Sequence, residues 1–247
     1  MAAVAVLAAG CGSTTHVFED AAPLPTTTTT STTSTTLPAC PQPAPPAGFQ
    51  STILATPTSA NLPYSATPGG PPVGKVVEHW GGTSTRPVEA EQGGWVEIRL
   101  ESRPNGSMGW VPTTDVTMSS TPFLIVVSIC NRSLTLYQGT QAMYQAPVGV
   151  GEPRWQTPKG PTFVDSIVAT PRSQLYIYGP TVLILGWHSD VFTTFDGGDG
   201  TVAIHGYPSD PGSTLGVASS HGCIRASPTT INTVKGVPVG TPVNIVT

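Results

Sequence analysis

The pattern of apolar and polar positions in the second half of the chain predicts many short strands. Residues 123–129 form a continuous β-prone run, which suits a strand covered on both faces. Residues 133–137 alternate and end at Gln138 and Gly139, so we expect a hairpin with the preceding run. Further strands are predicted at residues 143–150, 163–169, 175–178, 181–186, 202–204 and 242–246. One short helix is expected, with Ser227 as its N-cap, Pro228 at its first position and Gly236 at its end.

Residues 49–120 carry the signals of a small β-barrel. Residues 95–100 alternate in the period of a half-buried strand, residues 103–107 suit a hairpin loop, and residues 108–112 form the return strand. The two Gly-Trp-Val segments around this loop resemble a bacterial SH3-like domain, a module that often binds cell-wall peptides in exported proteins. The alternative is that Trp95 and Trp110 are only core aromatics of a spacer.

Composition supports a mainly β fold with little helix. The chain has 27 Gly and 27 Pro, which favour turn-rich β structure over a helical bundle. Charged residues make up 10% of the chain and the net charge is −4, so the basic patch of a nucleic-acid-binding protein is not expected.

The N-terminal residues suggest export. Residues 1–10 are apolar, too short to cross a bilayer, and are followed by Cys11, so they resemble a truncated signal segment with the lipobox of bacterial lipoproteins. We therefore expect a cell-envelope protein whose membrane contact is a lipid on Cys11; an ordinary signal peptide or a disordered N-terminus is the alternative. Residues 11–48 are rich in Thr, Ser and Pro and predict a disordered linker.

Two further cysteines leave a choice open. Cys40 lies in the linker and Cys130 follows a strand-like run. A disulfide between them is conceivable in an exported protein. Two unrelated thiols are the favoured expectation, because Cys130 lies beside an apolar run.

Residues 219–225 gather the groups that cysteine catalysis needs. A nucleophilic cysteine requires a base, a group that orients the base, and N–H donors for the oxyanion. Gly222 would allow a backbone conformation closed to other residues and would leave the Cys223 thiol exposed, with its own N–H directed at a substrate carbonyl. The alternative is a buried, inert cysteine.

The second half of the chain resembles the L,D-transpeptidase catalytic domain (YkuD type) of bacterial cell walls. The resemblance rests on residues 149–151, 156–161, 205–206, 220–225 and 240–243, in that order. It implies a β-rich, sandwich-like domain over residues 121–247. It also implies a reaction in which a thiolate attacks the tetrapeptide stem of peptidoglycan, expels D-Ala and passes the acyl group to an amine acceptor. No cofactor is implied, and the oligomeric state is left open.

The resemblance also implies roles for individual residues. Cys223 is the nucleophile, His205 the general base, and the Gly206 carbonyl fixes the tautomer of His205. His221 lines the site and forms an oxyanion hole with the N–H groups of Gly222 and Cys223. The expected substrate-binding residues are Ser220 and Arg225. Of the two, Ser220 is favoured as a hydrogen-bonding scaffold.

Each role has an alternative. His205 could be a histidine at a strand end without a role, His221 could support the turn, and Arg225 could form a structural salt bridge. Residues 187–190 and 196–200 could form a substrate lid, although a solvated loop is the default. Metal binding by His205, His221 and Cys223 is not supported by their spacing.

Three functions compete at this stage. The leading one is an L,D-transpeptidase. Water could instead take the acyl group, which would make the protein an L,D-carboxypeptidase. A non-catalytic wall-binding lipoprotein is the third, and the intact His205 and Cys223 argue against it. The order of the motif does not resemble a sortase site.

Overall fold

The computed structural model of the chain describes residues 39–77, 85–195, 197–209 and 212–247. The residues from Ala39 onward form one compact unit. The expected signal segment, Cys11 and the linker up to residue 38 lie outside the described residues. Of the described residues, 47% lie in strands and 9% in helices, which confirms the mainly β fold.

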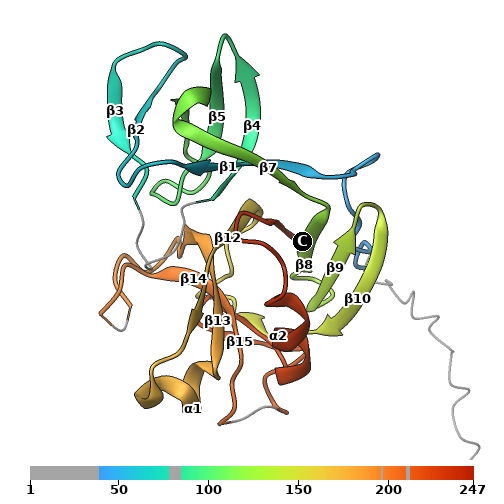
Figure 1. Cartoon of the computed structure of the whole chain (residues 1–247). Helices are drawn as coiled ribbons and strands as arrows, with labels where there is room; N and C mark the ends of the chain where they lie inside the picture. Colours follow the sequence, from blue (N-terminus) through green and yellow to red (C-terminus); the bar gives the residue numbers. More distant parts are fainter. Residues whose placement is uncertain (1–38, 78–84, 196, 210–211) are drawn as a thin grey trace, which may run out of the picture. The chain divides into compact units, whose positions relative to one another are not determined.

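The first sheet has seven strands in the order β3-β2-β6-β5-β4-β1-β7 (Figure 1). They are β1 (Thr52–Pro57), β2 (Pro63–Ser65), β3 (Pro72–Lys75), β4 (Arg86–Gln92), β5 (Trp95–Arg99), β6 (Met108–Pro112) and β7 (Val116–Thr121), with a 3-10 turn, η1 (Thr113–Asp115), before β7. The predicted hairpin is confirmed, because β5 pairs antiparallel with β6 from Trp95 opposite Pro112 to Arg99 opposite Met108. The sheet encloses its own small core, which includes Val96, Ile98 and Val111. The likeness to an SH3-like domain stays a prediction.

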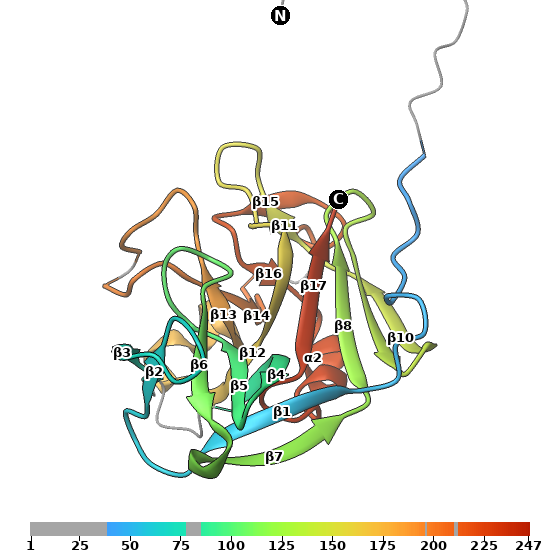
Figure 2. The same cartoon turned by 90° about the horizontal axis from the view of Figure 1, so that it is seen from above.

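The second sheet has eight strands in the order β10-β9-β8-β17-β12-β13-β14-β16, and β11 pairs with β15 separately. The strands are β8 (Phe123–Ser128), β9 (Ser133–Gln138), β10 (Gln141–Pro147), β11 (Val150–Gly151), β12 (Gly160–Ala169), β13 (Thr181–His188), β14 (Thr201–His205), β15 (Ala218–Ser220), β16 (Ile224–Arg225) and β17 (Pro242–Val246). Figure 2 shows β17 between β8 and β12. The expected hairpin of residues 123–137 is confirmed as β8 and β9.

The helices are short, and one predicted strand is wrong. Residues 175–178 form α1 (Leu175–Tyr178), which follows η2 (Arg172–Gln174). The β12–β13 ladder closes at Ala169 opposite Thr181, so the residues between lie in the connection and have no strand edge to join. Gly179 ends α1 at a φ of 71°, and its N–H donates to the Leu175 carbonyl.

The predicted C-terminal helix is confirmed as α2 (Pro228–Val234). The Ser227 hydroxyl accepts a hydrogen bond from the Thr230 N–H, and Pro228 occupies the first turn, where its missing N–H costs nothing. Ile231 and Val234 are buried in the large core, which they share with the inner faces of β8, β13 and β17. In the described part of the chain, no helix is long and apolar enough to span a membrane.

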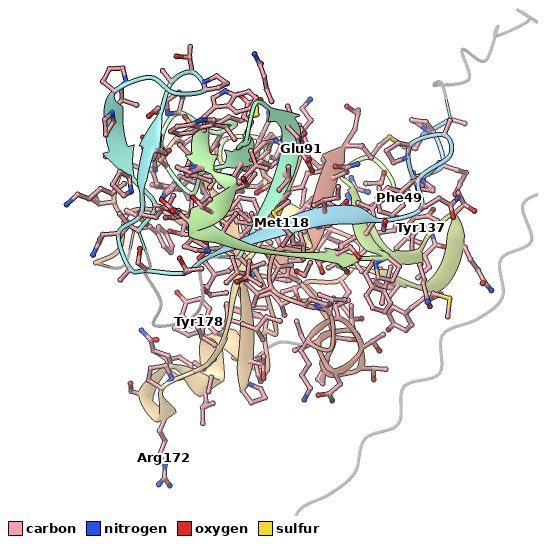
Figure 3. The ribbon with its side chains drawn as sticks, turned by 45° about the horizontal axis from the view of Figure 1, so that its top comes forward. Phe49, Glu91, Met118, Tyr137, Arg172 and Tyr178 are labelled. Atoms are coloured by element: carbon pink, nitrogen blue, oxygen red, sulfur yellow. A yellow bond between two sulfur atoms is a disulfide. The ribbon has the colours of Figure 1, made fainter. Side chains whose placement is uncertain are left out.

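The end of the expected linker is attached to the second sheet. Cys40 and Cys130 form a disulfide, so the expectation of two unrelated thiols is wrong. The Pro43 carbonyl accepts a hydrogen bond of 2.7 Å from the Tyr137 hydroxyl, and Phe49 packs on Tyr137 (Figure 3). The sequence left this pairing open as the less favoured alternative, because the two cysteines are 90 residues apart and meet only through the folded contacts.

A buried ion pair joins the two sheets. The Arg86 side chain on β4 donates a 2.6 Å hydrogen bond to the Asp165 carboxylate on β12, and the two side chains are 3% and 5% exposed. A charge transferred out of water needs such a partner, because desolvation costs several kcal/mol per ion.

We expect Asp165→Asn to lower the free energy of unfolding by about 3 kcal/mol, because it removes a carboxylate from a buried guanidinium. Urea unfolding at neutral pH measures this change. The matched control is Glu89→Gln, since Glu89 accepts an equally short 2.6 Å bond from Arg99 but lies at a more exposed position. The control should lose less than about 1 kcal/mol. Equal losses in both variants would contradict the role given to burial.

Candidate active site

His205 and Cys223 lie on one face of the second sheet. Strands β14 and β16 run parallel, with Ile204 opposite Ile224, and both isoleucines point into the large core. Because successive side chains alternate between the faces of a sheet, His205 and Cys223 point to the other face. There Cys223 packs against Ala203, two residues before His205. The ladder therefore places an imidazole and a thiol from two separate motifs on one face of the sheet.

The tautomer of His205 is set by a backbone carbonyl. His205 Nδ1 hydrogen-bonds to the Gly206 carbonyl oxygen, and because a carbonyl can only accept, Nδ1 must be the protonated nitrogen. Nε2 then carries the lone pair and can act as a base. The Gly206 N–H donates to the Tyr178 carbonyl at the end of α1, and the Tyr178 ring meets His205 edge-on at 5.0 Å between centroids. The wrongly predicted strand is thus the helix that supports the base.

Both groups are neutral at rest. Burial lowers the pKa of His205 to about 4, against the effect of its hydrogen bond to Gly206. Burial also raises the pKa of the Cys223 thiol. The thiol, expected to be exposed, is in fact half-buried. At neutral pH the site therefore holds a thiol and a neutral imidazole on one face of the sheet, which suits proton transfer during attack rather than a preformed ion pair.

Hydrogen bonds fix the turn before Cys223. Gly222 has a φ of 122°, the conformation that only glycine adopts easily. Its N–H donates to Ser220 Oγ, and Ser220 Oγ donates to the Cys223 carbonyl. Ser220 is therefore a scaffold, and the Gly222 N–H, expected in an oxyanion hole, is used within the turn instead. Thr157, which belongs to the motif of residues 156–161, donates a hydrogen bond of 2.8 Å to the Gly222 carbonyl.

His221 lies in an aromatic cluster that the sequence did not reveal. Its exposed ring stacks on Trp155 at 4.0 Å between centroids, and Phe195 and Phe192 lie 5.2 and 6.0 Å away. Desolvation, followed by the charge of Arg225, lowers the pKa of His221. These aromatics come from three separate loops, so no spacing in the sequence could indicate that they meet.

Arg225 lies beside the turn, and no acidic partner is found for it among the residues that the structure describes. Its guanidinium covers the Tyr207 ring at 4.1 Å and reaches the Ser219 carbonyl at 3.4 Å. Its Nε is buried and has no hydrogen-bond acceptor within the described ranges. The ion pairs found in those ranges do not include Arg225. Its free hydrogen-bonding capacity suits a carboxylate.

The loop between β13 and β14 covers the cysteine. A cavity of about 30 Å³ lies over Cys223, room for about one water. Its lining consists of Ser189, Phe192, Phe195, Gly200, Thr201, Val202, His221, Gly222 and Cys223. Trp187, His188 and Ser189 are buried, so the default of a solvated loop is wrong for residues 187–189.

Potential metal ligands gather elsewhere. Glu101, His188 and Asp199 are the one group of three such side chains found in the described ranges, and His188 Nε2 already bonds both carboxylates at 3.2 and 2.8 Å.

Solved structures similar to this chain include several L,D-transpeptidases. Bd1075 of Bdellovibrio bacteriovorus is similar, with 19% identity and a TM-score of 0.40 over 51% of this chain and 48% of that one, so this chain spans about half of it. An L,D-transpeptidase from Mycobacterium smegmatis is 20% identical, with a TM-score of 0.40 over 62% of this chain and 91% of that one. LdtMt1, solved in complex with imipenem, is 18% identical, with a TM-score of 0.43 over 79% of this chain and 82% of that one.

No curated protein matches the sequence. The family described as YkuD, the L,D-transpeptidase catalytic domain, matches residues 122–245, which is half of the chain. This match spans β8 to β17 and contains both His205 and Cys223. The chain therefore belongs to the family of the YkuD L,D-transpeptidase catalytic domain.

Proposed function

We propose that the protein is a cysteine-dependent L,D-transpeptidase that acts on the tetrapeptide stems of peptidoglycan. The observation that supports this most is the placement of Cys223 and His205 on one face of the β14–β16 ladder, with His205 Nδ1 bonded to a carbonyl. A thiol and an oriented, neutral imidazole on the same face are the two groups that acyl transfer through a thioester requires.

The reaction begins with proton transfer. His205 Nε2 takes the proton of Cys223 Sγ while the sulfur attacks the carbonyl that precedes the terminal D-Ala of the stem. The oxygen of the tetrahedral intermediate takes the negative charge, and the Cys223 N–H and the His221 ring are its proposed stabilisers. The intermediate collapses, the C–N bond breaks, and protonated His205 gives its proton to the leaving amine of D-Ala. The product is a thioester on Cys223.

In the second half of the reaction, the acyl group passes from Cys223 to an amine. An amine of a neighbouring stem attacks the thioester, His205 takes a proton from that amine, and the thiol of Cys223 is regenerated as the new amide forms. Arg225 is the proposed contact for a carboxylate of the substrate, because its guanidinium lies beside the turn and forms no ion pair in the described ranges.

The proposal also includes where in the cell the protein acts. The protein is proposed to be exported and held in the cell envelope by a lipid on Cys11, with the first sheet acting as an SH3-like module. The disulfide between Cys40 and Cys130 supports an exported protein, because disulfides persist mainly in oxidising compartments.

One incubation tests the proposed reaction. The protein is mixed with a tetrapeptide muropeptide and an isotope-labelled D-amino acid, and products are measured by mass spectrometry. We expect released D-Ala together with exchanged tetrapeptide that carries the label, because an amine takes the acyl group. Tripeptide without exchange product would identify a carboxypeptidase, and the absence of both products would identify a non-catalytic wall-binding protein.

A further inference from the structure

A hairpin of the first sheet holds the loop that covers Cys223. The connection from β5 to β6 carries Arg103, whose guanidinium donates to the carbonyls of Ser189, Phe192 and Asp199 at 2.8 Å each. All three carbonyls belong to the loop of residues 189–200, of which all but residue 196 are described. One side chain thus bonds the start, the middle and the end of the loop.

A second side chain of the hairpin fixes the point where the loop begins. Asn105 Oδ1 accepts from the His188 N–H at 2.8 Å, and Asn105 Nδ2 donates to the His188 carbonyl at 2.7 Å. His188 Nε2 also lies 3.2 Å from Glu101 Oε1 on the first-sheet side and 2.8 Å from Asp199 Oδ2 in the loop. Hydrogen bonding to Glu101 raises the pKa of His188 against the effect of burial, which favours the cation between two carboxylates.

The other side of the same loop forms the wall of the site. Phe192 and Phe195 pack on each other at 5.3 Å and approach His221, the residue two positions before Cys223. The Phe192 carbonyl that accepts from Arg103 also lies close to Gly200, where an added Cβ would be 2.4 Å from that oxygen. The position of Phe192 is therefore set from the hairpin side, while its ring faces the site.

We propose that Arg103 and Asn105 are positioning residues, which hold the 189–200 loop so that Phe192 and Phe195 form the wall of the Cys223 site. The inference rests on the proposed function for its effect on turnover, but not for its effect on the loop. The first sheet then acts on the reaction through this loop, beyond any wall-binding role.

The chemistry of arginine explains why this side chain suits the task. A guanidinium has five N–H donors in a fixed plane and stays charged at all working pH values, so it can serve three carbonyls at once. A lysine has the same charge on a single nitrogen and cannot reproduce that geometry. Loss of the three bonds frees the loop, and the cavity over Cys223, which holds about one water, opens.

The test compares the Arg103→Ala variant with a variant of a second arginine on the first sheet. Arg99→Ala is the control, since Arg99 also donates from the first sheet to a carbonyl of the second, that of Pro161, at 3.0 Å and away from the loop. Hydrogen–deuterium exchange of the 189–200 peptides, alkylation of Cys223 by iodoacetamide followed by peptide mass spectrometry, and D-Ala release are measured on the full chain. Thermal unfolding confirms that each variant is folded.

We expect Arg103→Ala to speed exchange in the loop and alkylation of Cys223 by about tenfold each, because local opening becomes easier. In the same variant, kcat for D-Ala release should fall about tenfold with little change in KM, since a displaced wall misorients the bound substrate. Asn105→Asp cannot donate to the His188 carbonyl. It should also raise the rates of loop exchange and Cys223 alkylation and lower kcat, each by less than Arg103→Ala does. Arg99→Ala should change none of them.

Unchanged loop exchange in Arg103→Ala, or equal changes in Arg99→Ala, would overturn the proposal. Full recovery in Arg103→Lys would also overturn it, because charge alone would then suffice. If the wild-type protein releases no D-Ala, the proposed function fails, while exchange and alkylation still decide whether Arg103 and Asn105 hold the loop.

Discussion

Cys223→Ala is expected to abolish D-Ala release, with a loss of at least about 10⁴-fold in kcat, because it removes the one free thiol found among the described residues. Ser220, the nearest hydroxyl in the sequence, donates to the Cys223 carbonyl and accepts from the Gly222 N–H, so it is held within the turn. Release of D-Ala from the tetrapeptide is measured by chromatography. In parallel, a carbapenem is expected to add to the wild-type protein at Cys223, and intact-protein mass spectrometry detects the adduct.

The control for this variant removes the other described cysteines. Cys40→Ser combined with Cys130→Ser deletes the disulfide, which joins the end of the linker to the β8–β9 turn and does not line the Cys223 cavity. This double variant should keep turnover at temperatures where it is folded. Unchanged turnover in Cys223→Ala, or an adduct on another residue, would rule out Cys223 as the nucleophile.

The strands and the two central residues could be predicted from local sequence. Apolar runs such as residues 123–129 become buried strands because their pattern suits only a covered sheet. Cys223 was a candidate because of its neighbours in residues 219–225, and His205 was assigned through the resemblance of residues 205–206 and 220–225 to the L,D-transpeptidase catalytic domain. Residues 175–178 were mispredicted because their side chains are typical of a strand but the segment lies in the connection between β12 and β13. The end of the β12–β13 ladder determines this, and the segment's own sequence does not.

The surroundings of the site could not be predicted for a related reason. Trp155, Phe192 and His221 come from separate loops and meet only once the sheet is formed. Arg103 resembled an ordinary hairpin residue, and its three acceptors are backbone carbonyls, which carry no signal in the sequence. Local motifs and the family resemblance therefore identified the candidate reacting groups, whereas the elements that position them depend on contacts between distant residues.

His205→Ala is expected to lower kcat/KM for D-Ala release by about 10³-fold, because the Cys223 thiol, whose pKa burial raises, loses its proton acceptor. The wild-type profile should fall on acidification with a midpoint near the His205 pKa of about 4. Protonation occupies Nε2 below that pH, and the base form is fully present at neutrality. The residual activity of His205→Ala should lack this acid limb.

The same titration should appear in stability. The unfolded chain binds a proton at the ordinary histidine pKa of about 6.5, whereas folded His205 does so only near pH 4. Between these values the unfolded state holds more protons, so the free energy of unfolding falls as the pH drops from about 6.5 to about 4. His205→Gln cannot titrate, so it should remove this part of the pH dependence of the free energy of unfolding. Unfolding curves of the same variant show whether it is folded under the conditions of the activity assay.

His221→Ala is the matched histidine variant. His221 stacks on Trp155 and is a proposed oxyanion donor, so its removal should lower kcat/KM by about 10²-fold, less than in His205→Ala, and leave the acid limb in place. A larger loss in His221→Ala than in His205→Ala would assign the proton transfer to His221. The carbonyl of Gly206 argues for the opposite order, because it fixes His205 in the tautomer whose Nε2 is a base, and a base held in the right tautomer needs no rearrangement when the thiol attacks.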